Sequence, residues 1–325
     1  MNPYPLLFEP SLHIKVWGGR AMEISLNKSL PPNEPVGESW EIYSENRIAN
    51  GEFSGLTLGE VTAQFPNEIV GSCNVENGFP LLIKFLDAQD WLSVQVHPDD
   101  TLALILEGEP RGKTECWYIL DAAPNAEIIY GFSTEMNKHD FRTAIENGNA
   151  KNCLQFVSVK AGDFVNVPAG TVHAIGPGIV LYELQQTSDT TYRLYDWERT
   201  GLDGNPRELH IDKGLQCSHF EVNSTAVSKQ ITELITDGIS LVSLLRGQYF
   251  GLDKIMLSKQ FWLNTESTTP HLLSVIEGTL EVRGEFTSVR LECGQSALIP
   301  AGVSEYMLHP IGTATLLCAF PQSNS

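Results

Sequence analysis

The ten residues AGDFVNVPAG at positions 161–170 recur as CGQSALIPAG at positions 293–302, an offset of 132 residues. Each copy places a glycine before a short apolar stretch and the tripeptide Pro-Ala-Gly after it. A second apolar stretch follows both copies, at residues 179–184 and at residues 314–320. One such turn is ordinary glycine and proline chemistry and would indicate little. Two copies at one offset, in the same apolar context, predict two related β units.

The glycine and proline spacing of the repeat resembles the second motif of cupins, which are small double-sheet jelly rolls. In cupins the turn precedes a position that often holds a metal-binding histidine, and this position is His173 in the first copy and Glu305 in the second. We therefore expect a mainly β fold, with tandem cupin-like jelly-roll β-barrels and small helical insertions. The polar stretch near residue 224 places the expected boundary, giving a metal-binding unit at residues 1–230 and a second unit at residues 231–325.

Short runs of aliphatic and aromatic residues, bounded by Gly, Pro and Asn, support this fold because such runs are typical of strands. The predicted strands are residues 40–43, 81–86, 92–97, 115–120, 128–132, 154–159, 164–167 and 179–184. Helical signals are fewer. Thr57 and Glu60 form a capping-box pattern that opens a helix to Phe65, Asp99 caps a turn through Leu106, and residues 134–147 form a polar amphipathic stretch.

Composition and charge narrow the possible functions. The chain has 325 residues, enough for about two domains, and its net charge is −19, from 21 Lys and Arg against 40 Asp and Glu. A chain this acidic is repelled by nucleic acids and anionic membranes, so we expect neither as a partner. We find no apolar run of membrane-spanning length and no signal-peptide pattern at the start. The six widely spaced cysteines favour buried, reduced thiols, and hence a cytoplasmic protein.

Four polar residues in or beside predicted strands form a candidate metal site. Gln95 and His97 are two apart, so both side chains leave the same face of their strand. Glu115 interrupts an apolar strand, where an ionised carboxylate needs a partner or a metal, and His173 follows the first Pro-Ala-Gly turn. A single histidine in a strand is usually structural. Together the four supply nitrogen and oxygen donors suited to zinc or another borderline divalent ion, with a position left for water or substrate.

The chain resembles the class I mannose-6-phosphate isomerases, specifically the short bacterial form. The resemblance runs through most of the chain and is carried by VWGG at 16–19, GESWE at 37–41, PLLIKFLD at 80–87, LSVQVHPD at 92–99, GKTECWY at 112–118, PAGTVH at 168–173 and YRLYDW at 192–197. The C-terminal unit resembles the family only in its expected fold.

The resemblance implies a zinc-dependent aldose–ketose isomerase that interconverts mannose 6-phosphate and fructose 6-phosphate through a metal-stabilised enediolate. It places the family's metal ligands on Gln95, His97, Glu115 and His173, with one zinc ion per chain. It also places the catalytic arginine on Arg193, which would otherwise be expected to pair with Asp189 or Asp196. Further substrate-side residues implied by the resemblance are Glu38, Ser93 and Lys113.

The phosphate dianion of the substrate requires a local basic pocket in this acidic chain. The candidate cations are Lys84, Lys113, Arg111 and Arg199, and the alternative for Lys84 is an ion pair with Asp87 or Asp90. Two other functions stay open at this stage: a non-catalytic cupin that binds a sugar or metabolite, and a metal-dependent oxygenase. The sequence does not identify the proton-transferring base, the metal used in cells, the range of aldoses, the direction of flux, the oligomeric state or the role of the C-terminal unit.

Overall fold

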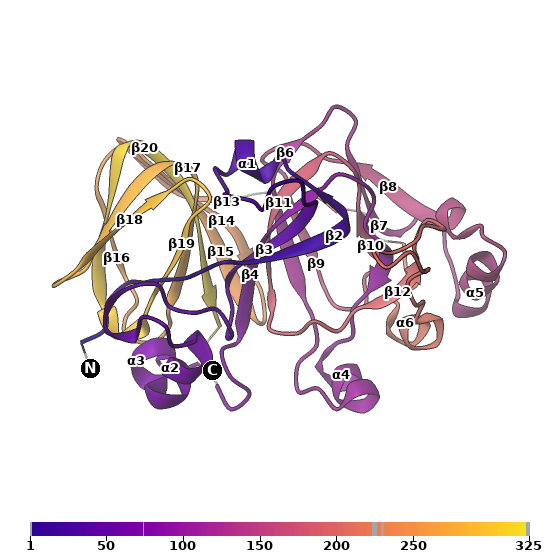
Figure 1. The fold of residues 1–325 in the computed structure, drawn as a ribbon, viewed down its shortest axis with the longest axis horizontal. Helices are drawn as coiled ribbons and strands as arrows, with labels where there is room; N and C mark the ends of the chain where they lie inside the picture. Colours follow the sequence, from indigo (N-terminus) through magenta and orange to yellow (C-terminus); the bar gives the residue numbers. More distant parts are fainter. Residues whose placement is uncertain (1, 74, 223–225, 229–230, 323–325) are drawn as a thin grey trace.

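The strands of the chain form three antiparallel sheets in a computed structural model that describes residues 2–73, 75–222, 226–228 and 231–322. Strands of the C-terminal third stack at one end of the molecule, and two sheets built from residues before 200 stand at the other (Figure 1). The helices are short, and none within the described ranges is long and apolar enough to cross a membrane. The predicted mainly β fold class is confirmed.

The N-terminal unit is a pair of sheets that face each other. The six-stranded sheet contains, in spatial order, β2 (Ser11–Gly19), β3 (Val36–Ile42), β4 (Leu81–Ala88), β11 (Ile179–Gln186), β6 (Glu115–Ala122) and β9 (Phe164–Val167). The five-stranded sheet contains β12 (Tyr192–Tyr195), β5 (Val94–Val96), β10 (His173–Ile175), β7 (Glu127–Phe132) and β8 (Leu154–Ser158). Apolar side chains from both sheets, including Trp117, Ile128 and Leu181, pack in one buried cluster between them.

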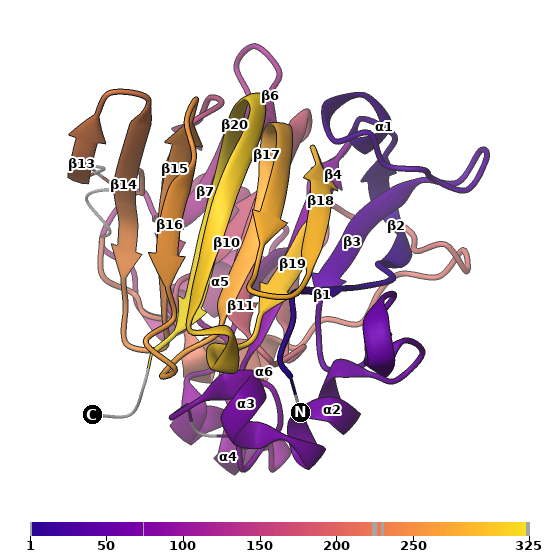
Figure 2. The same cartoon turned by 90° about the vertical axis from the view of Figure 1, so that its left-hand side faces the viewer.

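The C-terminal unit is built around two long strands, β17 (His271–Arg283) and β20 (Glu305–Pro321), which lie side by side in Figure 2. The remaining strands of this sheet are β1 (Leu6–Leu7), β13 (Ile231–Thr236), β14 (Ile239–Arg246), β15 (Phe250–Leu257), β16 (Phe261–Asn264), β18 (Ser288–Glu292) and β19 (Ser296–Ile299). One end of β17 pairs with β19 and the other with β18, while β20 pairs with β16 and then β15. The long strands therefore belong to both layers of the second barrel, around an apolar interior.

The helical insertions are α1 (Met22–Ser25), η1 (Gly51–Phe53), α2 (Leu58–Gln64), α3 (Pro66–Val70), α4 (Asp100–Glu107), α5 (Lys138–Glu146), η2 (Ala150–Cys153), α6 (Ile211–Cys217) and η3 (Ala301–Val303). The predicted capping box is present, with Thr57 and Glu60 each accepting from the other's backbone N–H. Helix α5 begins four residues later than predicted because the Asn137 side chain caps it. Helices α1, α3 and α6 were not predicted, since each is too short to show a helical period.

The sequence repeat corresponds to equivalent turns and strands in the two units. β9 and β19 occupy the same positions in the two copies, and the glycine before each strand has a positive φ, +90° at Gly162 and +83° at Gly294. This backbone conformation is favourable only for glycine, which explains why both copies keep it. After Pro-Ala-Gly, the first copy leads into β10 at His173 and the second into β20 at Glu305.

The two units share strands and core residues. β1, near the N-terminus, pairs with β19 of the C-terminal unit through Leu6 and Leu298. One apolar cluster joins Leu6, Phe85 and Tyr182 to Leu272 and other C-terminal side chains. The predicted boundary between residues 230 and 231 falls beside residues 229–230, which lie outside the described ranges, and we retain it as a proposal.

Candidate metal and substrate site

The four candidate ligands come from both sheets of the N-terminal unit and meet between them. Gln95 lies on β5 and His173 begins β10, directly opposite it in the strand register. His97 follows β5, which is shorter than the predicted strand, and Glu115 begins β6 on the facing sheet. Val94 and Val96 pack outward, against the cluster that includes Phe141 and Leu215 of the helices α5 and α6. The alternation of this strand therefore turns its polar residues inward.

The geometry of His97, Glu115 and His173 fits a candidate cation site. One ligand atom from each lies within 4.8 Å of the others. His97 Nε2 is 3.4 Å from Glu115 Oε2, and His173 Nε2 is 3.3 Å from Glu115 Oε1. The Nδ1 atoms face carbonyl oxygens, of Thr190 at 3.0 Å and of Thr171 at 2.8 Å, and so carry the ring protons. The Nε2 lone pairs thus point at the carboxylate with no proton between them.

Electrostatics explain why the two imidazoles stay neutral and the carboxylate stays ionised, which are the protonation states that bind a metal ion. Burial, followed by the nearby Lys113 ammonium, lowers the pKa of His97 to about 3, and burial also lowers the pKa of His173. Burial by itself would raise the pKa of Glu115, but the nearby Lys113 ammonium holds it well below its usual range. Within the described ranges, His97 Nε2 and Glu115 Oε1 have no hydrogen-bond partner, and Glu115 Oε2 has an ion-pair contact with Lys113 Nζ at 3.1 Å. A divalent cation fits this cluster of neutral imidazoles and an ionised carboxylate.

Gln95 lies beside the three-residue cluster. Its amide Nε2 is 3.3 Å from His173 Nε2, and its Oε1 accepts a hydrogen bond from Ser93 Oγ at 3.3 Å. A 180° turn of the amide exchanges these two atoms, which have nearly the same shape, and presents Oε1 to the cluster. Gln95 is therefore within reach of the metal position, and Ser93 lies next to it.

A row of side chains across the six-stranded sheet forms one side of the site. The strand register sets Trp40 of β3 beside Lys84 of β4, Lys84 beside Glu183 of β11, and Glu183 beside Trp117 of β6. Lys84 Nζ lies 3.4 Å from Glu183 Oε1 and 4.7 Å from the centre of the Trp40 ring. Trp117 Nε1 donates to Glu183 Oε2 at 3.0 Å. Each charge in this buried row thus has a partner.

Lys84 pairs with Glu38 and Glu183, not with Asp87 or Asp90, which sequence spacing had suggested. Its Nζ is 3.7 Å from Glu38 Oε2, while Asp87 accepts from backbone N–H groups at the start of α1. Burial would raise the pKa of Glu38, but the ammonium groups of Lys84 and Lys15 lower it to about 2. Glu38 is therefore ionised throughout the neutral range.

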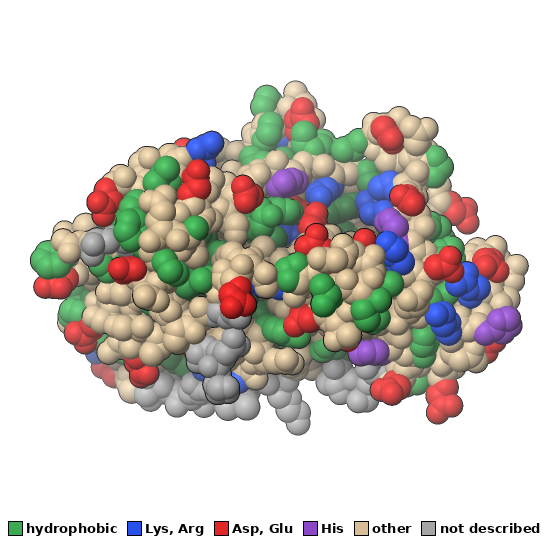
Figure 3. Space-filling view, turned by 90° about the horizontal axis from the view of Figure 1, so that it is seen from below, with side chains coloured by type: hydrophobic (Ala, Val, Ile, Leu, Met, Phe, Trp, Pro, Cys, Tyr) green, Lys and Arg blue, Asp and Glu red, His purple; other side chains and the backbone are tan. Residues whose placement is uncertain are grey.

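A cavity of 260 Å³ opens beside the metal ligands. Its lining includes five cations and three carboxylates: Lys15, Lys84, Lys113, Arg193, Arg207, Glu38, Glu183 and Asp189. In space-filling view, Lys and Arg side chains gather around a hollow on one face, while Asp and Glu side chains are spread across it (Figure 3). The excess of cations makes this cavity locally basic in a chain whose net charge is −19.

Two of the predicted phosphate candidates, Lys84 and Lys113, line the cavity, and two do not. Arg111 donates to the carbonyl oxygens of Asn77 and Gly78. Arg199 pairs with Asp196 at 2.9 Å and with Asp90 at 3.4 Å. Arg111 and Arg199 therefore hold loops together.

Arg193 projects into the cavity from β12. Its Nη1 donates to the carbonyl oxygen of Glu208 at 2.9 Å, and its buried Nε has no hydrogen-bond partner within the described ranges. Asp196, the alternative partner suggested by the sequence, instead pairs with Arg199 and Arg207. Arg193 therefore keeps N–H donors available on the cavity side.

Sequence reasoning did not place four charged residues at this cavity: Lys15, Glu183, Asp189 and Arg207. It considered Asp189 only as a possible ion-pair partner of Arg193. Glu183 had a recognisable signal, because it is a lone acidic residue within the apolar run 179–184. The other three reach the cavity from a strand edge and from loops, where no periodic pattern marks their direction.

A buried His–Glu–His cluster between the sheets of a jelly roll, beside a basic cavity, defines a cupin with a candidate metal site and an enzyme-like cavity. Residues 6–126 match the family described as phosphomannose isomerase type I, catalytic domain, and residues 239–320 match mannose-6-phosphate isomerase, cupin domain. The chain is 40% identical over 319 residues to mannose-6-phosphate isomerase ManA of Bacillus subtilis strain 168, covering 95% of this chain and 96% of that relative.

Two further comparisons agree. The mannose-6-phosphate isomerase of Streptococcus mutans is 36% identical, over 93% of this chain and 94% of the relative. The crystal structure of the mannose 6-phosphate isomerase from Bacillus subtilis superposes with a TM-score of 0.88 at 35% identity, over 97% of this chain and 99% of that one. The chain belongs to the type I mannose-6-phosphate isomerase family, and by this membership it is an aldose–ketose isomerase. The resemblance and the cupin fold expected from the sequence are confirmed.

Proposed function

We propose that this chain interconverts mannose 6-phosphate and fructose 6-phosphate in the cavity beside His97, Glu115 and His173. The observation that supports this location is the convergence of the two imidazole lone pairs on an ionised, buried carboxylate. Gln95 completes a set of four ligands. Five cations at the same cavity give a phosphorylated sugar a place to bind.

The metal that best suits these donors is zinc, one ion per chain. Two neutral imidazoles, a carboxylate and an amide oxygen are the nitrogen and oxygen ligands of a borderline divalent ion. Such an ion would supply Lewis-acid polarisation of the oxygens on C1 and C2 of the sugar. Other divalent ions that accept the same donors remain alternatives to zinc.

The protein's own side chains supply the rest of the chemistry. Isomerisation moves a proton between C2 and C1, so charge develops on adjacent oxygens of the open-chain sugar. Arg193 presents a permanently charged guanidinium to the cavity and would stabilise that oxyanion. Glu38, Glu183 and Asp189 are the carboxylates at hand for proton transfer, and we assign the base to none of them.

The remaining polar residues would position the substrate. Ser93 and Lys113 adjoin the metal ligands Gln95 and Glu115, at 3.3 Å and 3.1 Å, so they are placed to bind oxygens near the reacting carbons. Lys84 and Glu38 form an ion pair in the cavity wall. The phosphate would be attracted by the whole set of cations, within roughly one Debye length of about 8 Å at physiological salt.

We also propose that the protein works in the cytoplasm. All six cysteines are free, and four of them, Cys73, Cys116, Cys217 and Cys318, are buried. Unpaired thiols in this number are typical of a reducing compartment.

The test is conversion of mannose 6-phosphate to fructose 6-phosphate by the purified chain, before chelation, after chelation and after zinc is restored. We expect activity to disappear on chelation and return with zinc. A folded, metal-loaded sample without turnover would contradict the proposal and favour the alternative, a cupin that only binds a sugar or metabolite.

A further inference from the structure

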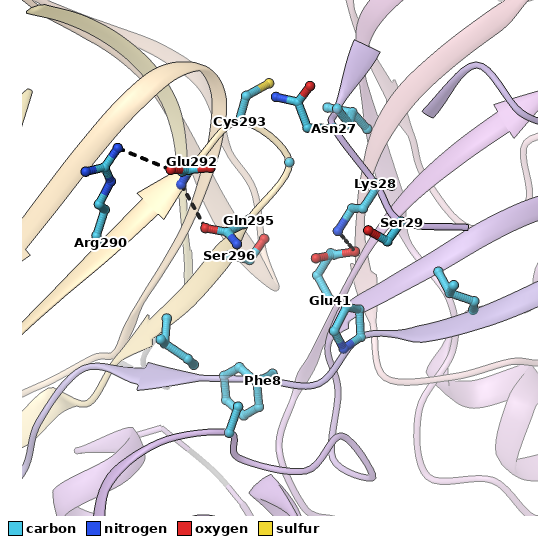
Figure 4. A pocket seen from close by; sticks show the side chains of 16 residues that line it. Phe8, Asn27, Lys28, Ser29, Glu41, Arg290, Glu292, Cys293, Gln295 and Ser296 are labelled. Atoms are coloured by element: carbon cyan, nitrogen blue, oxygen red, sulfur yellow. Dashed lines mark hydrogen bonds and ion pairs between the residues drawn. The ribbon is translucent and has the colours of Figure 1, made fainter. Parts of the chain in front are cut away.

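A second cavity, of 570 Å³, lies where the two units meet. One wall is formed by the segments 7–12 and 26–29 and by Glu41 of β3, and the opposite wall by the turn between β18 and β19 (Figure 4). None of its lining residues lines the catalytic cavity. The size is within the range of small-molecule sites, about 300–1,000 Å³.

The charges in this inter-unit cavity cancel. Lys28 Nζ lies 2.6 Å from Glu41 Oε1, and both side chains are nearly buried, 9% and 4% exposed. Across the cavity, Arg290 pairs with Glu292 at 3.2 Å. Two cations and two carboxylates leave no net charge in the lining, in contrast to the excess of cations at the catalytic cavity. The Arg290–Glu292 pair is exposed at the rim, but a charged ligand seated beside Glu41 would have to break the buried Lys28–Glu41 pair, so the lining favours a neutral ligand.

Polar groups on both walls are oriented toward the space between them. Lys28 and Ser39 both donate to the same oxygen of Glu41, Oε1. The other Glu41 oxygen is turned toward the opposite wall, where Gln295 lies (Figure 4). Gln295 Oε1 accepts from the Glu292 backbone N–H at 2.8 Å, which commits its oxygen and leaves the amide N–H groups to donate. A buried acceptor and a donor thus face one another across the cavity.

The rest of the lining is partly apolar. Leu7, Phe8 and Leu26 line the cavity between the polar groups, while Asn27 and Ser29 provide an amide and a hydroxyl at its mouth. Hydroxyl-rich molecules with exposed C–H groups match this mixture, because their hydroxyls pair with carboxylate and amide groups while their C–H faces pack on apolar side chains.

We propose that the inter-unit cavity binds a neutral monosaccharide or polyol. Glu41 accepts from ligand hydroxyls, Gln295 donates to them, and Phe8 packs against the C–H groups. The site is separate from the phosphosugar site, both in its residues and in its charge. It gives the second unit a role in ligand binding.

The test measures binding of mannitol, which is not an aldose, to the zinc-loaded full chain by titration calorimetry, without and with saturating mannose 6-phosphate. Gluconate, of similar size but anionic, tests the charge class. Ala49 is exposed and lines the cavity, so Ala49→Trp fills it from the rim. Ala63, exposed on α2 and outside the cavity, gives the matched control Ala63→Trp.

We expect saturable mannitol binding that is lost in Ala49→Trp, unchanged in Ala63→Trp, and stronger than gluconate binding. Mannose 6-phosphate turnover stays unchanged in both variants. Glu41→Gln weakens mannitol binding at least about tenfold, the cost of losing a hydrogen bond to a charged group. The proposal is overturned by absence of mannitol binding, by mannitol binding that mannose 6-phosphate displaces or Ala49→Trp leaves intact, or by tighter binding of gluconate.

Discussion

The two barrels of this chain use one turn motif and fill their interiors differently. In the first, the turn after β9 delivers His173 to a buried cluster with Glu115 and His97. In the second, the matching turn after β19 includes a short 3-10 helix, and Glu305 is exposed at the start of β20. The interior of the second barrel is packed with leucine, valine and isoleucine. A shared backbone motif therefore supplies one ligand position, and the partner strands decide whether a site exists.

The prediction with the largest expected effect exchanges the residues that follow the two turns. His173→Glu gives the first copy the residue of the second and sets a second carboxylate against Glu115. We expect loss of bound zinc and of measurable isomerisation, because two buried like charges disfavour each other and one imidazole ligand is gone. Metal analysis of the purified protein and the sugar-phosphate conversion assay measure both effects, with circular dichroism as the check on folding.

The reciprocal variant is the matched control. Glu305→His places an imidazole at the equivalent but exposed position, where the second barrel offers an apolar interior instead of partner ligands. Zinc content and turnover are expected to equal those of the parent chain. A second zinc ion in Glu305→His, or full activity in His173→Glu, would show that the turn alone specifies the site.

Within the first barrel, Arg193→Ala separates the metal site from the catalytic cavity. Arg193 lines the cavity, and its Nη1 donates to the carbonyl oxygen of Glu208, which is not a candidate ligand. We expect zinc to be retained and the turnover rate to fall by about 10²–10³, the range for losing one oxyanion-stabilising donor. Activity at the parent level would remove Arg193 from the proposed mechanism.

The sequence was sufficient for the fold, and it predicted which side chains would lie close together at the candidate metal site, because each has a local signal. The repeated turn predicted two β units, and the alternation of Gln95 and His97 predicted their shared direction. The partners of Lys84 were not predictable, since they depend on strand register: Glu38 and Glu183 come from the strands on either side of β4. The inter-unit cavity had no sequence signal at all, because its walls are distant in the chain.

The paired glycines provide a smaller test of the same repeat. Ala in place of Gly162 or Gly294 adopts an unfavourable positive φ, which costs about 1–2 kcal/mol. A Cβ at Gly294 would also lie 2.0 Å from the Leu26 carbonyl oxygen, whereas at Gly162 the nearest atom is the Tyr118 hydroxyl at 3.9 Å. We expect Gly294→Ala to lower the urea midpoint more than Gly162→Ala. Equal midpoints would mean that the contact between units adds nothing to stability.

The smallest expected effect concerns one of the histidines of the second barrel, His271, whose Nδ1 lies 2.7 Å from the Tyr306 hydroxyl. Burial lowers the pKa of His271 from 6.5 to about 4. Between these two pKa values, His271 binds a proton in the unfolded chain but not in the folded chain. The contribution of neutral His271 to the free energy of unfolding is therefore complete above pH 6.5 and declines as the pH falls toward 4.

Between pH 7 and pH 6 this loss is under about 1 kcal/mol for a single histidine. His271→Gln, which keeps a polar partner for Tyr306, removes the titrating group. We expect its melting temperature to fall less than that of the parent over this interval, with the metal site saturated in both proteins so that His97 and His173 contribute equally. If the melting temperatures of the two proteins fall equally between pH 7 and pH 6, the packing of the second barrel does not require the neutral form of His271. In that case its interior would tolerate charge, and the contrast with the polar site of the first barrel would rest on missing partner ligands alone.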